Sequence, residues 1–96
     1  MVRKLYLKEY NDKSDEYKMM SDFGNLVAHK LLDMGYDAYY SIPYEGSREI
    51  NFSFYDSDGN EKYLGTIYSS RLNFNWTYDQ LKRFANKIVK ELVSDI

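Results

Sequence analysis

The chain has few of the residue types that usually mark a reactive or membrane-bound protein. It contains 96 residues with no cysteine, one proline and one histidine. The absence of cysteine excludes disulfides, thiol catalysis and cysteine-built zinc or iron–sulfur sites in this sequence, and it fits a cytoplasmic location. No apolar run approaches the ~18 residues of a membrane span, and residues 1–10 lack the apolar core of a signal peptide. We therefore expect one folded domain over residues 1–96, in the cytoplasm and without membrane contact.

The sequence also lacks the patterns typical of enzymes and of metal or cofactor sites. His29 is the only histidine, so a histidine-rich metal site is excluded, and no partner nucleophile is evident for it. The five glycines are scattered singly, which leaves no phosphate-binding loop. Residues 56–61 have the composition of a calcium loop, but Gly59 stands fourth and Ile67 twelfth, where an EF-hand has glutamate. We expect no catalytic activity, no metal and no cofactor.

Tyrosine and charge are unevenly distributed along the chain. Eleven tyrosines stand against five phenylalanines and one tryptophan, and eight of the eleven lie between Tyr36 and Tyr78. The net charge is −2, but residues 37–80 hold seven acidic and three basic side chains, whereas residues 81–96 hold four basic and two acidic ones. An acidic, tyrosine-rich middle segment therefore precedes a basic segment.

The spacing of apolar residues predicts two amphipathic helices, over residues 15–34 and 77–94. The second begins with Thr77-Tyr78-Asp79-Gln80, which matches a capping box. The apolar stripe of the first consists of Met20, Phe23, Val27, Leu31 and Met34.

Alternation of apolar and polar residues predicts strands over residues 2–8, 36–42 and 48–55, and a further strand after the Asp58-Gly59 turn. Two amphipathic helices and an antiparallel meander form an α+β two-layer sandwich. We expect the order β-α-β-β-β-α, with both helices on one face of the sheet and the other face uncovered.

The Asp58-Gly59 pair predicts a two-residue hairpin turn. In the resulting register Phe54 pairs with Tyr63 and Phe52 pairs with Gly65. A three-residue loop with the glycine in a bulge is the alternative, and it shifts the register by one residue. With the two-residue turn, Tyr40 and Tyr63 face the core, whereas the outward-facing tyrosines are Tyr39, Tyr55 and Tyr68.

The uncovered sheet face combines tyrosines with carboxylates. Tyrosine offers a large rigid contact area with a hydrogen-bonding tip, and it is enriched at binding surfaces. Because the surrounding charge is acidic, a protein with a basic surface is the expected partner. Pairing of two copies through this face, as a homodimer, is an alternative. The residues predicted to bind the partner are Asp37, Tyr39, Glu49, Tyr55, Asp56, Asp58, Glu61 and Tyr68.

The Asp58-Gly59-Asn60-Glu61 turn lies between two predicted strands. Along the sequence, one predicted helix precedes the strands and the other follows them. In this layout, which covers residues 36–90, the chain resembles small phage anti-CRISPR proteins, in particular inhibitors of type II RNA-guided nucleases. The resemblance implies a phage or mobile-element inhibitor without catalytic activity that acts in the host cytoplasm. It also implies that acidic side chains occupy a basic DNA-recognition surface of the nuclease.

The last predicted helix carries a basic stripe formed by Arg83, Lys87 and Lys90. A solvated outer face and the helix dipole explain cations at these positions without any partner. Contact with the phosphate backbone of a nucleic acid is the alternative function. The layout helix–strand–strand–strand–helix resembles the double-stranded RNA-binding domain, whose last helix begins with lysines that contact phosphates. Here that helix begins with Thr77-Tyr78-Asp79-Gln80, which contains an acidic residue and no lysine.

Overall fold

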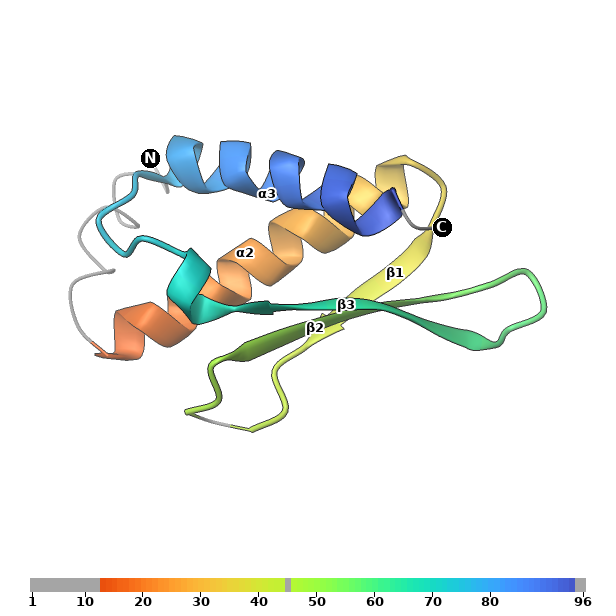
Figure 1. Ribbon diagram of the computed structural model, residues 1–96, viewed down its shortest axis with the longest axis horizontal. Coiled ribbons are helices and arrows are strands. Elements are labelled where there is room, and N and C mark those ends of the chain that lie inside the picture. The colour runs from red at the N-terminus through yellow and green to blue at the C-terminus, as the bar shows by residue number, and fades with distance from the viewer. Residues whose placement is uncertain (1–12, 45, 95–96) are drawn as a thin grey trace.

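The computed structural model describes residues 13–44 and 46–94. These residues form two helices and three strands in the order helix–strand–strand–strand–helix (Figure 1). The strand predicted over residues 2–8 lies outside the described residues. The elements are α2 (Lys13–Asp33), β1 (Asp37–Ser41), β2 (Glu49–Tyr55), β3 (Glu61–Tyr68), the short 3₁₀ helix η1 (Ser69–Arg71) and α3 (Tyr78–Val93).

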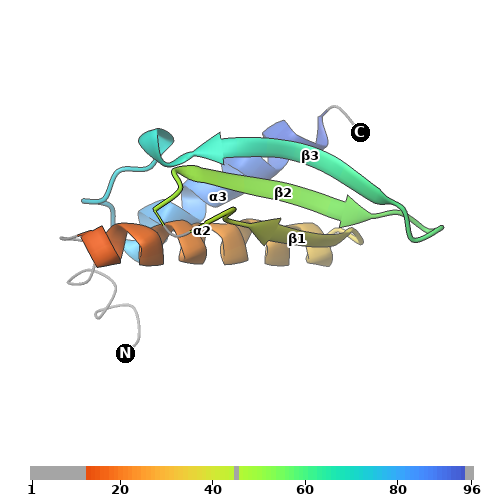
Figure 2. The same cartoon turned by 90° about the horizontal axis from the view of Figure 1, so that it is seen from below.

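The three strands form one antiparallel sheet with β2 in the centre. Figures 1 and 2 show α2 and α3 on the same side of this sheet, and no helix of the described chain covers its other side. The predicted α+β two-layer sandwich is therefore confirmed. Within residues 13–44 and 46–94, neither helix is long and apolar enough to cross a membrane.

Phe23 connects the two helices and the sheet in one core. Its ring packs edge-on against Phe52 of β2, with ring centroids 6.0 Å apart, and stacks on Phe84 of α3 at 5.5 Å. Such aromatic pairs stabilise a fold beyond the area that they bury. The predicted α2 stripe is buried at Met20, Phe23, Val27 and Leu31.

The end of α2 departs from the predicted stripe, because Met34 is 48% exposed. Gly35 has a φ of +99°, a backbone conformation that glycine adopts without strain. The Tyr36 amide donates to the Leu31 carbonyl at 3.0 Å and the Gly35 amide donates to the Leu32 carbonyl at 3.0 Å. These two hydrogen bonds form a Schellman motif, which ends the helix at Asp33 and turns the chain into β1.

The start of α3 is fixed by the predicted capping box. The Gln80 amide donates to Thr77 Oγ1 at 3.2 Å, and the Thr77 amide donates to Gln80 Oε1 at 2.8 Å. Trp76, the residue before the cap, packs against Phe84 with ring centroids 5.1 Å apart. The cap and this contact together set the direction in which α3 crosses the sheet.

The hairpin between β2 and β3 corrects the predicted register. The Gly59 amide donates to the Asp56 carbonyl at 3.0 Å, the Asp56 amide donates to the Asn60 carbonyl at 2.9 Å, and Gly59 has a φ of +81°. This is the three-residue loop with a bulged glycine, not the two-residue turn. It shifts the pairing of residues 53–55 by one, so Phe54 lies opposite Lys62 and not opposite Tyr63.

A second irregularity restores the predicted pairing further along the strands. Phe52 pairs with Gly65 as predicted, while the adjacent Ser53 pairs with Tyr63, which leaves Leu64 as an extra residue in a β-bulge. Gly65 and Ile67 therefore face the core, whereas Tyr63 faces outward and is 66% exposed. The predicted core position of Tyr63 is wrong for this reason.

Candidate functional site

The side of the sheet away from the helices carries most of the residues that the sequence selects for partner binding. We call it the open face. The strand register places its side chains in cross-strand rows: Asp37, Tyr55 and Glu61; Tyr39, Ser53 and Tyr63; Ser41, Asn51 and Thr66; and Glu49 with Tyr68. Adjacent strands are ~4.8 Å apart, so neighbours in a row are within side-chain reach of one another.

Tyr39 and Tyr55 form an aromatic pair near the end of the open face next to the hairpin turn. Their ring centroids are 5.4 Å apart and the rings are inclined by 24°, an offset-stacked arrangement. The Tyr39 hydroxyl reaches across β2 and donates a hydrogen bond to Glu61 Oε2 on β3. This bond, together with burial and contact with Tyr55, raises the pKa of Tyr39 to about 12. The phenol stays protonated at neutral pH and holds the Glu61 carboxylate in one orientation.

A second polar group on the open face links β3 to β2. Thr66 Oγ1 donates to Asn51 Oδ1, so its only hydroxyl hydrogen is used there. The hydroxyl of Tyr63, which lies close to Thr66 Oγ1, is therefore the donor in that contact. Tyr63 is anchored at its tip while most of its ring remains exposed.

The carboxylates of the open face carry uncompensated negative charge. Asp37, Glu49 and Glu61 form no ion pair with any residue in the described part of the chain. Their neighbours Tyr55 and Tyr68 are 42% and 51% exposed, so aromatic surface and carboxylates are presented together. This combination attracts cationic groups, which bind to carboxylates and to aromatic ring faces.

The two predicted site residues of the hairpin turn have different surroundings. The Asp56 side chain accepts hydrogen bonds from the Asp58 and Asn60 amides at Oδ1, each at 2.9 Å, and its Oδ2 lies 3.9 Å from Lys62 Nζ. The hydrogen bond from the Asn60 backbone amide is the main cause that holds the pKa of Asp56 below its usual range. Asp56 therefore shapes the turn, whereas Asp58 is exposed at its tip.

Sequence reasoning missed Tyr63 as a member of the open face. The bulge at Leu64 turns Tyr63 outward, and no local pattern in the sequence marks that bulge. The alternative three-residue loop was the only signal, since it shifts Tyr63 away from the core side. Asn51 and Thr66, which anchor Tyr63, were likewise not selected as site residues.

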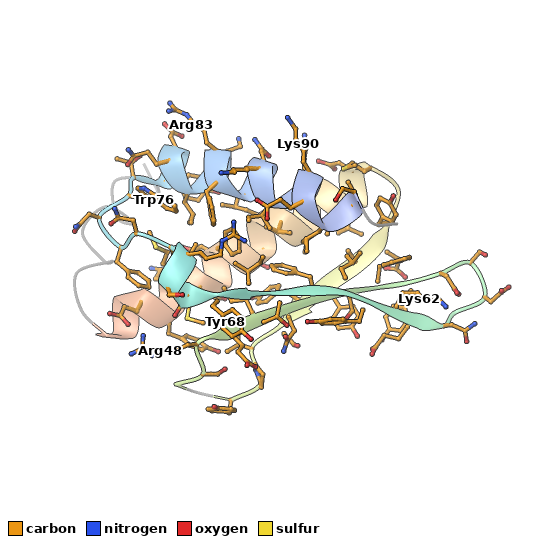
Figure 3. All side chains as sticks on the ribbon, viewed as in Figure 1. Arg48, Lys62, Tyr68, Trp76, Arg83 and Lys90 are labelled. Carbon is orange, nitrogen blue, oxygen red and sulfur yellow. The ribbon has the colours of Figure 1, made fainter. Side chains whose placement is uncertain are left out.

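The predicted basic stripe lies on the opposite side of the molecule. Arg83, Lys87 and Lys90 are exposed on α3, and Figure 3 shows Arg83 and Lys90 directed away from the sheet that carries Tyr68. Within the described residues these three cations form no ion pair. Lys90 lies in the last turn, where the helix dipole favours a cation.

His29 lines a pocket between α2 and the start of α3. The pocket has a volume of about 360 Å³ and is lined by Asp22, Asn25, Leu26, His29 and Tyr78. His29 itself is exposed. Among residues 13–44 and 46–94, no group of three histidine, aspartate or glutamate side chains is arranged to hold a metal ion.

The comparisons with known proteins found no relative of this chain. No protein-family model, no curated protein and no solved structure matches the chain. The functional reading therefore rests on the chemistry of the open face.

Proposed function

We propose that this protein is a non-catalytic interaction protein that binds a basic surface of another protein through its open face. The observation that supports this proposal is the presentation of Tyr39, Tyr55, Tyr63 and Tyr68 together with carboxylates on the side of the sheet that neither described helix covers, where these carboxylates have no ion-pair partner among the described residues. Rigid aromatic side chains provide the buried anchors of such interfaces. Carboxylates steer a basic partner and fix its orientation.

The charge of the open face favours a basic protein as the partner over a nucleic acid or a second copy of this chain. A nucleic acid brings phosphates, which Asp37, Glu49 and Glu61 repel. A second copy of the same face brings the same three carboxylates, and like charges brought together across an interface weaken association. A protein with exposed lysine and arginine brings positive charge, so these carboxylates attract it.

The resemblance to small anti-CRISPR proteins names the first partner to examine. We propose that the chain is a phage or mobile-element inhibitor that occupies the DNA-recognition surface of a type II RNA-guided nuclease in the host cytoplasm. Such a surface is basic because it binds phosphates. Stoichiometric occupation of this surface inhibits the nuclease without any catalytic group in the inhibitor.

The proposal is tested by charge reversal on the two sides of the molecule. A sheet variant carries Asp37→Lys, Glu49→Lys and Glu61→Lys, and a matched helix variant carries Arg83→Glu, Lys87→Glu and Lys90→Glu. Tagged forms of both and of the unaltered protein are used to capture host proteins, and each is added to a purified type II nuclease in a DNA-cleavage assay. We expect the sheet variant alone to lose the captured basic proteins. Loss of capture with the helix variant alone would contradict the proposal.

Nucleic-acid binding through α3 is the alternative function. It is supported by the exposure of Arg83, Lys87 and Lys90 on one side of the helix without ion-pair partners among the described residues. This function predicts a mobility shift of labelled duplex DNA or RNA at low salt, which weakens steeply as salt rises. The helix variant is expected to abolish that shift and the sheet variant to leave it intact.

A further inference from the structure

The end of the open face next to the hairpin turn has the components of a site for a guanidinium group. Tyr55 lies on the central strand, directly opposite Asp37 of β1 on one side and Glu61 of β3 on the other. One exposed aromatic ring is therefore flanked by two carboxylates in a single cross-strand row. Neither carboxylate has an ion-pair partner in the part of the chain that the structure describes.

Tyr39 lies beside this row and contacts two of its side chains, Tyr55 and Glu61. It stands opposite Ser53, two residues before Tyr55, so it stacks on the Tyr55 ring from that side. Its hydroxyl donates to Glu61 Oε2, which leaves Oε1 available for a second donor. Tyr55 nevertheless remains 42% exposed, so part of its surface is accessible to a partner.

The protein holds one of its own arginines with the same combination of groups. The Arg71 guanidinium carbon lies 5.5 Å from the centroid of the Phe84 ring, and its two terminal nitrogens lie 3.3 Å from the two carboxylate oxygens of Glu91. An aromatic ring and a carboxylate together bind a planar guanidinium by stacking and by paired hydrogen bonds. On the open face a ring and carboxylates are present, and none of the described arginines forms a cation–π contact or an ion pair with them.

We propose that Asp37, Tyr55 and Glu61 bind an arginine side chain of the partner protein, with the guanidinium stacked on Tyr55 and hydrogen-bonded to a flanking carboxylate. This inference rests on the proposed function and specifies the chemistry of its partner. Tyr55 is the residue that distinguishes arginine from lysine, because an ammonium group pairs with one carboxylate but lacks a planar surface to stack on the ring.

The experiment uses the full chain, labelled with ¹⁵N, and three blocked pentapeptides that differ in one residue. The peptides carry arginine, lysine or citrulline between pairs of glycines, since citrulline keeps the planar shape of arginine without its charge. Amide shifts are followed during titration by NMR. We expect the arginine peptide to shift the amides around Asp37, Tyr55 and Glu61 and to bind about two- to fivefold more tightly than the lysine peptide. The citrulline peptide is expected to bind more weakly than either.

Variants separate the ring from the charge. Tyr55→Phe keeps the ring and is expected to keep the arginine preference, whereas Tyr55→Thr keeps a strand-forming residue and is expected to bind both peptides equally. Glu61→Gln is expected to weaken binding of the arginine peptide. Glu16→Gln, which removes the same charge near the start of α2 and outside the open face, is expected to leave it unchanged. The spectrum of each free variant shows whether it is folded.

Two results would overturn the arginine site. The first is equal affinity of the unaltered protein for the arginine and lysine peptides. The second is an arginine peptide that leaves the amides of this row unshifted. In either case the proposed function is still decided separately by charge reversal, which measures capture of whole proteins and does not depend on one cation type.

Discussion

Substitution of Tyr63 by lysine tests the strand register that creates the open face. In the two-residue-turn register this side chain points into the core, where an unpaired ammonium group costs several kcal/mol and exceeds what a small fold tolerates. In the structure Tyr63 is 66% exposed and lies opposite Ser53 on the outer side. The two registers therefore predict very different stabilities for the same variant.

The expected cost of Tyr63→Lys follows from the covered part of the tyrosine. About a third of a side chain of roughly 200 Å² is covered, and at ~25 cal/mol per Å² its loss is worth about 2 kcal/mol at most. The lysine stem covers part of the same surface, which brings the expected loss to about 1 kcal/mol. The contact with Thr66 is lost as well, but it lies at an exposed position where water replaces it.

Urea unfolding, followed by far-ultraviolet circular dichroism, measures this loss. Ile67→Lys is the matched control on the same strand, since Ile67 is 4% exposed and its substitution is expected to prevent folding. A loss of more than about 3 kcal/mol for Tyr63→Lys, similar to a buried charge, would refute the bulged register.

Three further predictions concern the contacts that hold the open face and the helices in place. Glu61→Gln is expected to lower the pKa of Tyr39 from about 12 toward its ordinary value of 10.0, as measured by NMR titration, and an unchanged pKa would contradict the Tyr39–Glu61 contact. Because the folded-state pKa lies above that of an unfolded tyrosine, this contact stabilises the fold below pH 10 and its contribution is lost as the pH rises toward 12. Gly24→Ala is expected to destabilise the fold by about 1–3 kcal/mol in urea unfolding, because the added Cβ would lie 2.5 Å from Tyr40 Cδ2. This clash outweighs the higher helix propensity of alanine. A more stable variant would show that the packing of Gly24 against Tyr40 is wrong. Thr77→Ala is expected to cost about 1 kcal/mol in thermal unfolding while Thr77→Ser costs little, and equal effects of the two would argue against the capping box.

Features that depend on a few neighbouring residues were predictable from the sequence. The capping box requires one hydroxyl and one amide side chain three residues apart, and Thr77 and Gln80 are present at that spacing. The end of α2 at Asp33 follows from the backbone freedom of Gly35, two residues further on, at the end of an apolar stripe. Local chemistry favours such features, so a few neighbouring residues are enough to predict them.

The register of the hairpin was only partly predictable, because two irregularities offset each other. The bulged loop at Gly59 shifts the strands by one residue, and the extra residue Leu64 shifts them back. The pairs Phe52–Gly65 and Ile50–Ile67 are therefore the same with or without both irregularities. The apolar pattern of the sequence agrees with these core pairs in both cases. It therefore does not reveal that the strands are shifted by one residue between these pairs and the hairpin turn.

The open face was predictable in composition but not in its internal contacts. Alternation in the strands placed Tyr39, Tyr55 and Tyr68 on one side, and the structure places them there. The hydrogen bond between Tyr39 and Glu61 joins the two outer strands across the central one, so it depends on the order of strands in the sheet. No sequence period encodes a contact between strands that are not paired with each other.

We propose that the open face, and not the basic side of α3, contacts a basic protein. Site-specific photo-crosslinking tests it most directly, with a benzophenone side chain placed at Tyr63 in one form of the protein and at Lys87 in a control form. We expect the Tyr63 form to crosslink to a protein whose mapped contact site is rich in arginine and lysine, and the Lys87 form to give no such product. Crosslinks from Lys87 with none from Tyr63 would contradict the account.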